Sequence, residues 1–374
     1  MPAITMLIKP ASSSCNLRCK YCFYYDTAEN RDIANYGIMK EDTLEAIVKK
    51  AFEYGEYHVG FAFQGGEPTL AGLDFFKTFI KLQNQYNTNG IKVQNSLQTN
   101  GVAIDENWAK FLSENRFLVG LSLDGPKDIH DLNRIDVKGT GSFRDVMRAA
   151  RIMDKYKVEY NILTVVTKPV ARHVQKVYGF FAKEGFHYMQ FIPCLDHMFG
   201  EHGTNPYSLT PKMYGEFLIK LFDLWYKDFK NGRMVSIRMF DNILQILSGH
   251  RAESCDMNGI CSVNTVIEAD GSIYPCDFYV LDDYRMGNIK EDTLDSVLSS
   301  EIGKNFVEKS ISIRKECDGC EFFSICRGGC QRHYDTTKEI RTNYFCASYK
   351  MFYGYSLPKF QEVLRILAGG RSRV

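Results

Sequence analysis

Cys15-Asn16-Leu17-Arg18-Cys19-Lys20-Tyr21-Cys22 is the stretch that decides how this chain is interpreted. It places three cysteines on one short loop, directly after a predicted strand at 4–9. Three thiolates suit an iron–sulfur cluster, and because such a cluster needs four ligands, one iron would keep an open position for a substrate or cofactor. From this triplet alone, a closed zinc site with a distant fourth ligand or three unrelated buried thiols are the alternatives.

The composition of the chain is that of an ordinary globular protein. Its 374 residues suffice for one large domain and a smaller one, with 45% hydrophobic and 24% charged residues. The net charge of +1 gives no electrostatic reason to bind nucleic acid or an anionic membrane. The sequence shows neither a signal peptide nor an apolar run of the roughly 20 residues that span a membrane. We therefore expect a cytoplasmic protein, and we expect it to be a monomer.

Cysteine is distributed unevenly along the chain. In a reducing compartment, twelve cysteines point to metal rather than to disulfides. Cys194 stands alone and is expected to be a small buried core residue. Eight others gather in the last third, which is the ligand number of two closed four-ligand sites, for clusters or for zinc. These eight are Cys255, Cys261, Cys276, Cys317, Cys320, Cys326, Cys330 and Cys346.

Strands and helices alternate up to about residue 193, so the fold class is α/β. Strands are expected at 4–9, 59–63, 91–97, 117–123, 158–166 and 188–193, with helices of apolar 3.6-residue periodicity after most of them. Repeated βα units close into full or partial barrels, whose active sites lie at the C-terminal strand ends. Because glycine and polar motifs follow four of these strands, we predict a partial (β/α)6 barrel with its site at that edge.

The rest of the chain reads as a second, cysteine-rich domain. Helices are expected at 211–229, 240–247 and 349–367, and Ala269-Asp270-Gly271 between β-rich runs predicts a hairpin. We divide the chain into the barrel at 1–235, the cysteine-rich domain at 236–348, and a C-terminal helix at 349–374 that packs on the barrel.

Two motifs together resemble the signatures of radical S-adenosylmethionine (SAM) enzymes. One is the cysteine loop, with Tyr21 before its last cysteine, and the other is Gly65-Gly66-Glu67-Pro68 at the end of the second strand. Alone, the second motif would be only a turn with a solvated carboxylate. The resemblance implies a 4Fe–4S cluster held by Cys15, Cys19 and Cys22, with SAM bound at its open iron.

The resemblance also implies which side chains hold SAM. Glu67 and a backbone carbonyl would accept hydrogen bonds from the SAM amine, and the two glycines before Glu67 would let the backbone approach closely. Ser122 and Arg134 would hold the ribose and the carboxylate, since an arginine fork suits a carboxylate. Leu195 would pack on the adenine, and Tyr21 of the cysteine loop is also expected to bind the cofactor. A surface ion pair for Arg134 and plain core packing for Leu195 are the alternatives.

The late cysteines resemble the SPASM extension found on peptide-modifying radical SAM enzymes. This resemblance implies two auxiliary clusters, so that the protein would carry three 4Fe–4S clusters in all. The first auxiliary cluster would be held by Cys255, Cys261, Cys276 and Cys330, and the second by Cys317, Cys320, Cys326 and Cys346. Two zinc sites are the alternative.

Asp277 directly follows the predicted cluster ligand Cys276. A carboxylate in this place could serve as a general base close to an electron acceptor. The alternative is a turn residue that caps backbone amides.

Nearly the whole chain is similar to one SPASM subgroup, the anaerobic sulfatase-maturating enzymes. The similarity is carried by the segments 8–13, 63–72, 96–101 and 275–281. In that subgroup the aspartate at the Asp277 position is the base. By the same resemblance, we expect Tyr24, Gln64 and Gln98 to contact the substrate.

The implied function is oxidation of a cysteine or serine side chain of a sulfatase to Cα-formylglycine. A 5′-deoxyadenosyl radical from SAM would take a hydrogen from Cβ, and Asp277 would take the thiol or hydroxyl proton. The remaining electron would pass to the nearer auxiliary cluster, and the thioaldehyde formed from cysteine would hydrolyse. The implied partners are a sulfatase polypeptide and a one-electron donor such as flavodoxin or ferredoxin.

Two other functions are compatible with the cysteine pattern. A related SPASM enzyme could modify or crosslink a ribosomal peptide; a leader-peptide-binding module would favour this, and we expect none ahead of Met6. The second alternative function is that of a zinc-bearing scaffold protein without redox chemistry. A metal analysis that finds about twelve iron and twelve sulfide ions per chain would indicate three clusters and exclude the zinc scaffold.

Overall fold

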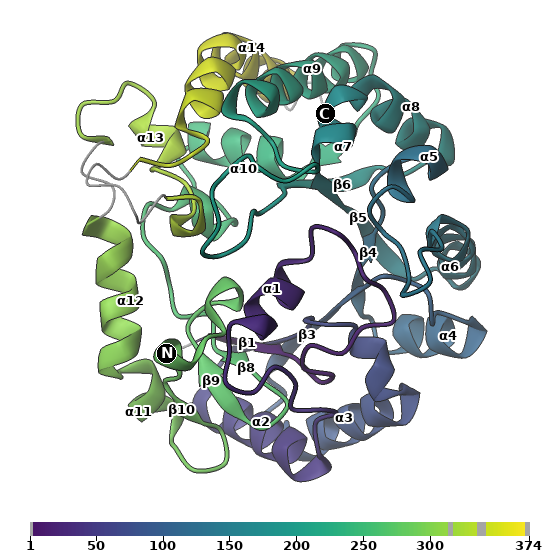
Figure 1. Ribbon diagram of the computed structural model, residues 1–374, viewed down its shortest axis with the longest axis vertical. Helices are drawn as coiled ribbons and strands as arrows, with labels where there is room; N and C mark the ends of the chain where they lie inside the picture. Colours follow the sequence, from purple (N-terminus) through teal and green to yellow (C-terminus); the bar gives the residue numbers. More distant parts are fainter. Residues whose placement is uncertain (1–2, 313–316, 335–341, 371–374) are drawn as a thin grey trace. The chain divides into compact units, whose positions relative to one another are not determined.

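The computed structural model describes residues 3–312, 317–334 and 342–370 (Figure 1). In this part of the chain, the six predicted barrel strands are all present. They are β1 (Ile4–Ile8), β2 (His58–Phe63), β3 (Lys92–Thr99), β4 (Leu118–Ser122), β5 (Glu159–Val166) and β6 (Tyr188–Pro193). The main helices between them are α2 (Glu41–Tyr54), α3 (Leu73–Tyr86), α4 (Glu106–Glu114), α6 (Phe143–Tyr156) and α8 (Val174–Glu184).

The first four strands are parallel neighbours. Ile4 of β1 lies opposite Val59 of β2, and β2 pairs in turn with β3, and β3 with β4. Four more short strands follow, β7 (Ser236–Ile237), β8 (Val266–Ile267), β9 (Ser272–Tyr274) and β10 (Gly287–Asn288). The hydrogen-bonded order in the described chain is β10-β9-β8-β1-β2-β3-β4-β5-β6-β7.

The predicted hairpin is formed by β8 and β9, which pair antiparallel on either side of the Asp-Gly turn. Its position in the sheet was not predicted. β8 lies parallel to the outer side of β1, with Leu7 opposite Val266 and Ile8 opposite Ile267. Leu7 packs on a buried cluster of Val266, Tyr274 and Val280. The hairpin therefore extends the barrel sheet at its first strand.

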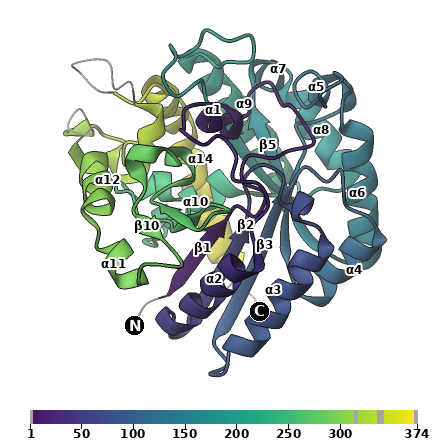
Figure 2. The ribbon, with the colours of Figure 1, turned by 60° about the horizontal axis from the view of Figure 1, so that its bottom comes forward.

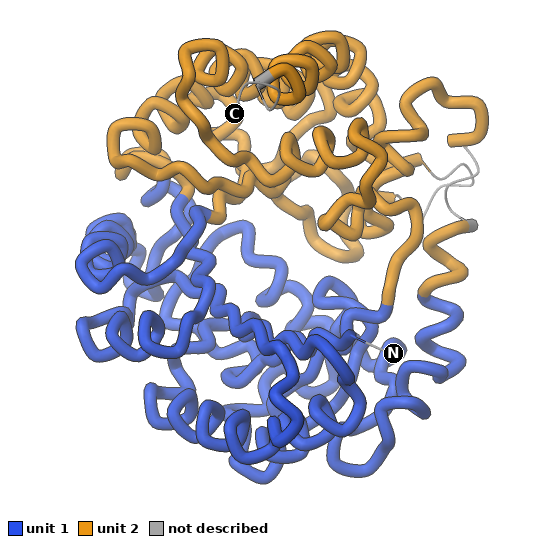
Figure 3. The backbone as a smooth tube through the Cα atoms, turned by 180° about the vertical axis from the view of Figure 1, so that it is seen from behind, with its two compact units in different colours: residues 1–123, 130–162, 263–306 blue, residues 124–129, 163–262, 307–374 orange. Residues whose placement is uncertain are grey.

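The described chain groups into two compact units, shown in Figure 3. Unit 1 contains residues 1–123, 130–162 and 263–306, and unit 2 contains 124–129, 163–262 and 307–374. The limits of these two units do not coincide with the domain boundaries predicted from the sequence, which fall after residues 235 and 348. Those boundaries stay a prediction.

The core of unit 1 is aromatic. α2 buries Leu44, Ile47, Val48 and Ala51 at the helical spacing that predicted it, and α3 lies beside it along the strands (Figure 2). On β2, the Phe63 ring meets Phe79 of α3 at 4.8 Å between centroids, in an edge-to-face arrangement. Such pairs add to the free energy gained by burial. This packing fixes the end of β2, where the Gly-Gly-Glu-Pro motif begins.

In unit 2, two long helices pack on each other. They are α9 (Pro211–Lys230) and α14 (Cys346–Gly370). α14 covers the predicted C-terminal helix up to residue 370, and positions 371–374 of that prediction lie outside the described residues. The Phe222 and Phe360 rings lie 4.7 Å apart, and Tyr226 Oη and Lys230 Nζ both reach Glu362. Among the described residues, no helix combines the length and the apolar character needed to cross a membrane.

Candidate active site

The cysteine loop connects β1 to α1 (Phe23–Glu29), a short helix that was not predicted and begins directly after Cys22. The loop is tied to the segment at 133–135, because the Arg18 N–H donates to the Ile135 carbonyl and the Lys20 N–H to the Asn133 carbonyl. Burial raises the pKa of the Cys15 thiol to about 11, and the Leu17 N–H that donates to its Sγ opposes this. Binding of iron would release these thiol protons.

The Gly-Gly-Glu-Pro motif packs on the cysteine loop itself. Gly65 and Gly66 both have positive φ, at 93° and 57°. A Cβ on Gly66 would collide with the carbonyl oxygen of Ser14, and the Glu67 N–H donates to the same oxygen at 2.8 Å. Glycine is therefore required at 66 for the close approach of two protein segments.

Glu67 is buried, with 2% of its surface exposed, and its carboxylate already has partners. It accepts hydrogen bonds from the Thr69 N–H and hydroxyl, from the Thr99 hydroxyl, and from the Asn100 N–H at 2.6–3.1 Å. Burial raises the pKa of Glu67, and these donors oppose the rise. Glu67 thus ties the end of β2 to the end of β3. Its predicted contact with the SAM amine stays a prediction.

Asn100 is a site residue that the sequence reasoning missed. Its Nδ2 lies 2.7 Å from Asn16 Oδ1 and 3.7 Å from Cys15 Sγ. The signal that could have found it is the polar Thr99-Asn100-Gly101 run at the end of the third strand, which lies in the segment 96–101 that carries the family similarity.

The other predicted SAM residues lie on several elements. Ser122 is the last residue of β4 and is buried. Arg134 is also buried, with its guanidinium 5.5 Å from the centre of the Tyr21 ring, so it does not lie on the surface. Leu195 follows β6 in unit 2 and is half-buried. The roles of these residues toward SAM stay predictions.

Asp277 begins a short 3-10 helix (Asp277–Tyr279) after β9, and its carboxylate is held by two side chains. The Tyr24 hydroxyl donates to Oδ2 at 2.5 Å and the Gln64 amide donates to the same oxygen at 2.9 Å. Oδ1 is buried and has no hydrogen-bond partner among the described residues. Burial raises the pKa of Asp277, which nearby Lys9, Tyr24 and Gln64 counteract. The carboxylate of Asp277 thus accepts hydrogen bonds from side chains, and not from the backbone amides that the capping alternative requires.

Of the three predicted substrate residues, the structure brings Tyr24 and Gln64 together at Asp277. Tyr24 lies on α1, and Gln64 is the residue directly after β2. Gln98 lies on β3 and is half-buried. Contact of any of the three with substrate stays a prediction.

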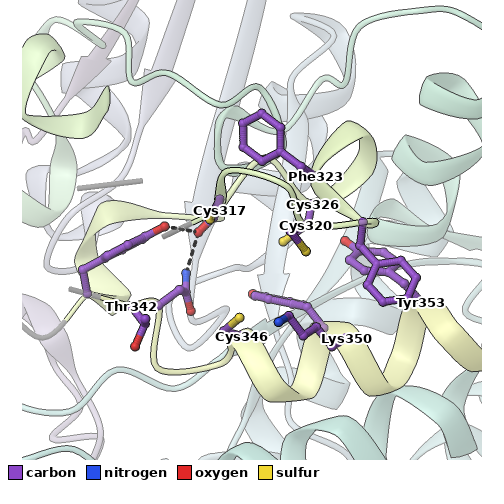
Figure 4. A pocket seen from close by; sticks show the side chains of 13 residues that line it. Cys317, Cys320, Phe323, Cys326, Thr342, Cys346, Lys350 and Tyr353 are labelled. Carbon is purple, nitrogen blue, oxygen red and sulfur yellow. Dashed lines mark hydrogen bonds between the residues drawn. The ribbon is translucent and has the colours of Figure 1, made fainter. Parts of the chain in front are cut away.

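Four cysteines of unit 2 line one small cavity with mostly apolar and aromatic neighbours (Figure 4). They are the predicted ligands of the second auxiliary cluster, Cys317, Cys320, Cys326 and Cys346. Burial raises the pKa of Cys326 to about 12. Four thiols around one hollow are the donor set of a 4Fe–4S cluster. Among the described residues, no three His, Cys, Asp or Glu side chains are arranged for a single metal ion.

The ligands predicted for the first auxiliary cluster come from both units. Cys255, Cys261 and Cys330 belong to unit 2, where burial raises the pKa of Cys330 and the thiols of the other two raise it further. Cys276 belongs to unit 1, beside Asp277. Cys194 is a buried residue whose thiol donates to the Tyr207 carbonyl, as expected of a core cysteine.

Comparison of this chain with known protein families and sequences shows which family it belongs to. The Radical SAM superfamily pattern matches residues 10–180, and the SPASM iron–sulfur cluster-binding domain matches residues 255–321. The cysteine-type anaerobic sulfatase-maturating enzyme of Clostridium novyi is 52% identical over 370 residues, covering 98% of this chain and 99% of that relative. The chain belongs to the anaerobic sulfatase-maturating enzyme family.

Further members of this family and a solved structure agree. A cysteine-type enzyme of Clostridium perfringens is 51% identical over 97% of this chain and 99% of its own. A serine-type enzyme of Klebsiella aerogenes is 31% identical, and the match covers 97% of this chain and 88% of that enzyme. The structure of native anSMEcpe with bound AdoMet superimposes with a TM-score of 0.94 at 50% identity, covering 97% of this chain and 99% of that one. The predicted radical SAM fold with its SPASM extension is confirmed, and the protein is an enzyme.

Proposed function

We propose that this enzyme converts a cysteine side chain of a sulfatase to Cα-formylglycine. The relatives at 50–52% identity are cysteine-type maturating enzymes, whereas the serine-type enzyme of Klebsiella aerogenes is 31% identical. A matching structure contains native anSMEcpe with AdoMet and the Cp18Cys peptide, which supports a cysteine-bearing peptide as substrate. The observation that carries the proposal is Asp277, which directly follows the predicted cluster ligand Cys276 and whose buried Oδ1 has no hydrogen-bond partner in the described part of the chain.

Each group of residues has one task in this reaction. Cys15, Cys19 and Cys22 would hold the cluster that, with SAM bound, supplies the hydrogen-abstracting radical. Asp277 Oδ1 takes the thiol proton of the target cysteine, because Oδ2 is already engaged by Tyr24 and Gln64. Burial of this carboxylate makes it a stronger proton acceptor than an exposed one.

The two auxiliary sets of cysteines would hold 4Fe–4S clusters, and such clusters could accept the electron that oxidation of the substrate releases. Cys276 would bring one acceptor next to the carboxylate that takes the proton, so that proton and electron leave the substrate at the same place. We also propose that a one-electron donor of the flavodoxin or ferredoxin class reduces the first cluster, and that the enzyme works as a monomer in the cytoplasm.

The test uses Asp277→Asn and a sulfatase peptide of roughly 18 residues, the scale of an extended bound segment. Because general bases contribute about 10²–10⁴ in rate, the variant should make at least about 100-fold less formylglycine while still cleaving SAM. Mass spectrometry identifies the product by loss of two hydrogens and exchange of sulfur for oxygen.

The matched control is Asp283→Asn, the same change at an exposed position shortly after Asp277. It should make formylglycine at the wild-type rate. Full product formation by Asp277→Asn would reject the base assignment, and wild-type enzyme that leaves the peptide unchanged would reject the proposed function.

A further inference from the structure

A buried ion triad lies in unit 1, close to the residues that hold Asp277. Glu268 follows β8 and is fully buried, and its Oε1 lies 2.7 Å from both Lys9 Nζ and Arg31 Nη1. Burial raises the pKa of Glu268, but the two cations outweigh this and bring it to about 2. Buried ions persist only when they are paired, so each cation helps to keep this carboxylate in the core.

The two cations differ in what else they contact. The Lys9 stem passes across Gly65, where a Cβ would lie 2.6 Å from Lys9 Cε and 2.7 Å from its Cγ. Lys9 Nζ is also 5.4 Å from the centre of the Tyr24 ring. Lys9 therefore touches one residue that holds Asp277 and the immediate neighbour of the other, Gln64.

Arg31 has different neighbours. Its Nη2 donates to the Ala34 carbonyl at 2.7 Å, and its guanidinium lies 5.5 Å from the centre of the Tyr36 ring. It shares Glu268 with Lys9, but within the described part of the chain its hydrogen bonds, ion pair and ring contact involve neither Tyr24 nor Gln64. The chain thus offers a natural comparison, two cations on one buried carboxylate with only one of them beside the partners of Asp277.

We propose that Lys9 is a positioning residue for the proton-accepting carboxylate. Its stem fixes the Gln64-Gly65 turn and its ammonium end fixes the Tyr24 ring, so that Tyr24 and Gln64 keep Asp277 Oδ2 engaged and leave Oδ1 directed to the substrate. Glu268 anchors Lys9 from the same hairpin segment that leads to Asp277. The proposal rests on the proposed function, because it assigns Lys9 a role only if Asp277 takes the substrate proton.

The test compares Lys9→Met with Arg31→Met. Both changes leave Glu268 with one cation, so both should lower the denaturant midpoint by a similar amount. Each variant is assayed for 5′-deoxyadenosine and for formylglycine peptide. In Lys9→Met the ratio of formylglycine to 5′-deoxyadenosine should fall by about 10- to 100-fold, since a small displacement of a catalytic group has effects of this size. In Arg31→Met the ratio should stay at the wild-type value.

An equal ratio in the two variants would show that Lys9 is only half of a structural ion pair and would overturn the proposal. If Lys9→Met does not fold, the double variant Lys9→Met/Glu268→Gln also removes the buried charge of the carboxylate that has lost one of its two cations. A low ratio in the double variant supports positioning, whereas a restored ratio rejects it. Wild-type enzyme reports on the proposed function separately, because formylglycine must form there whatever Lys9 does.

Discussion

The variant Glu67→Gln tests whether the Glu67 carboxylate stabilises the protein by holding the end of β2 to the end of β3. In the wild type, Oε1 accepts from the Thr69 N–H at 3.1 Å, the Thr69 hydroxyl at 2.6 Å and the Thr99 hydroxyl at 2.7 Å. Oε2 accepts from the Asn100 N–H at 2.7 Å. An amide has the same shape, but one of its two ends is a donor.

The magnitude follows from these four bonds. With the amide oxygen in the Oε1 position, three bonds remain and the NH2 group faces the Asn100 N–H, so two buried donors meet. An unsatisfied buried donor costs about 1–3 kcal/mol, and the loss of the negative charge weakens the other three bonds. Against this, the neutral amide avoids the desolvation that raises the pKa of Glu67. We expect a net loss of about 2 kcal/mol in the free energy of unfolding.

The assay is anaerobic urea unfolding of the reconstituted enzyme, with Glu45→Gln as control. Glu45 is half-buried on α2 and accepts a hydrogen bond from the Tyr86 hydroxyl at 2.7 Å, so its loss should cost only about 0.5–1 kcal/mol. If the two variants unfold at the same urea concentration, Glu67 does not fasten β2 to β3.

Two further predictions concern the buried glutamate and the cysteines. The stability that Glu268 contributes is complete above its ordinary pKa of 4.5 and is lost as the pH falls toward about 2, so wild type should lose about 3 kcal/mol more than Glu268→Gln across this window. Denaturant midpoints at falling pH measure this, and parallel pH profiles of the two proteins would contradict it. Cys326→Ala should lower the iron content from about twelve to about eight per chain, because a cluster holds four irons, while Cys194→Ala should keep all twelve. An unchanged iron content in Cys326→Ala would show that the cavity of Figure 4 holds no cluster.

The sequence predicted those parts of the fold that depend on local pattern. The apolar spacing of α2 and the β-rich runs of β1 to β6 are readable within short windows, and these elements lie where they were expected. α1 was missed because it is short and its Cys22 N-cap makes no side-chain capping bond. The hairpin was found from its Asp-Gly turn, but its pairing with β1 was not, because no local pattern encodes which distant strand is the neighbour.

The site shows the same division. The cysteines and the motif at 65–68 follow from spacing and resemblance, whereas the partners of their side chains do not. Nothing in the sequence pairs Glu67 with Asn100, or Glu268 with Lys9, since these contacts join elements far apart in the chain. Asp277 was singled out from its place after Cys276, but the free Oδ1 that supports its role is visible only in three dimensions.

The pairing of β8 with β1 has a consequence for synthesis of the chain. β1 and β2 leave the ribosome early, but the strand that covers the other edge of β1 arrives only when Val266 and Ile267 have been made. Until then the nascent chain carries a row of unpaired backbone groups, which is a template for association with other chains. Late, non-local pairing of this kind is slow and aggregation-exposed. A polypeptide that stops before Val266 therefore lacks the native cover of β1, and truncated expression products of this enzyme should collect in the insoluble fraction.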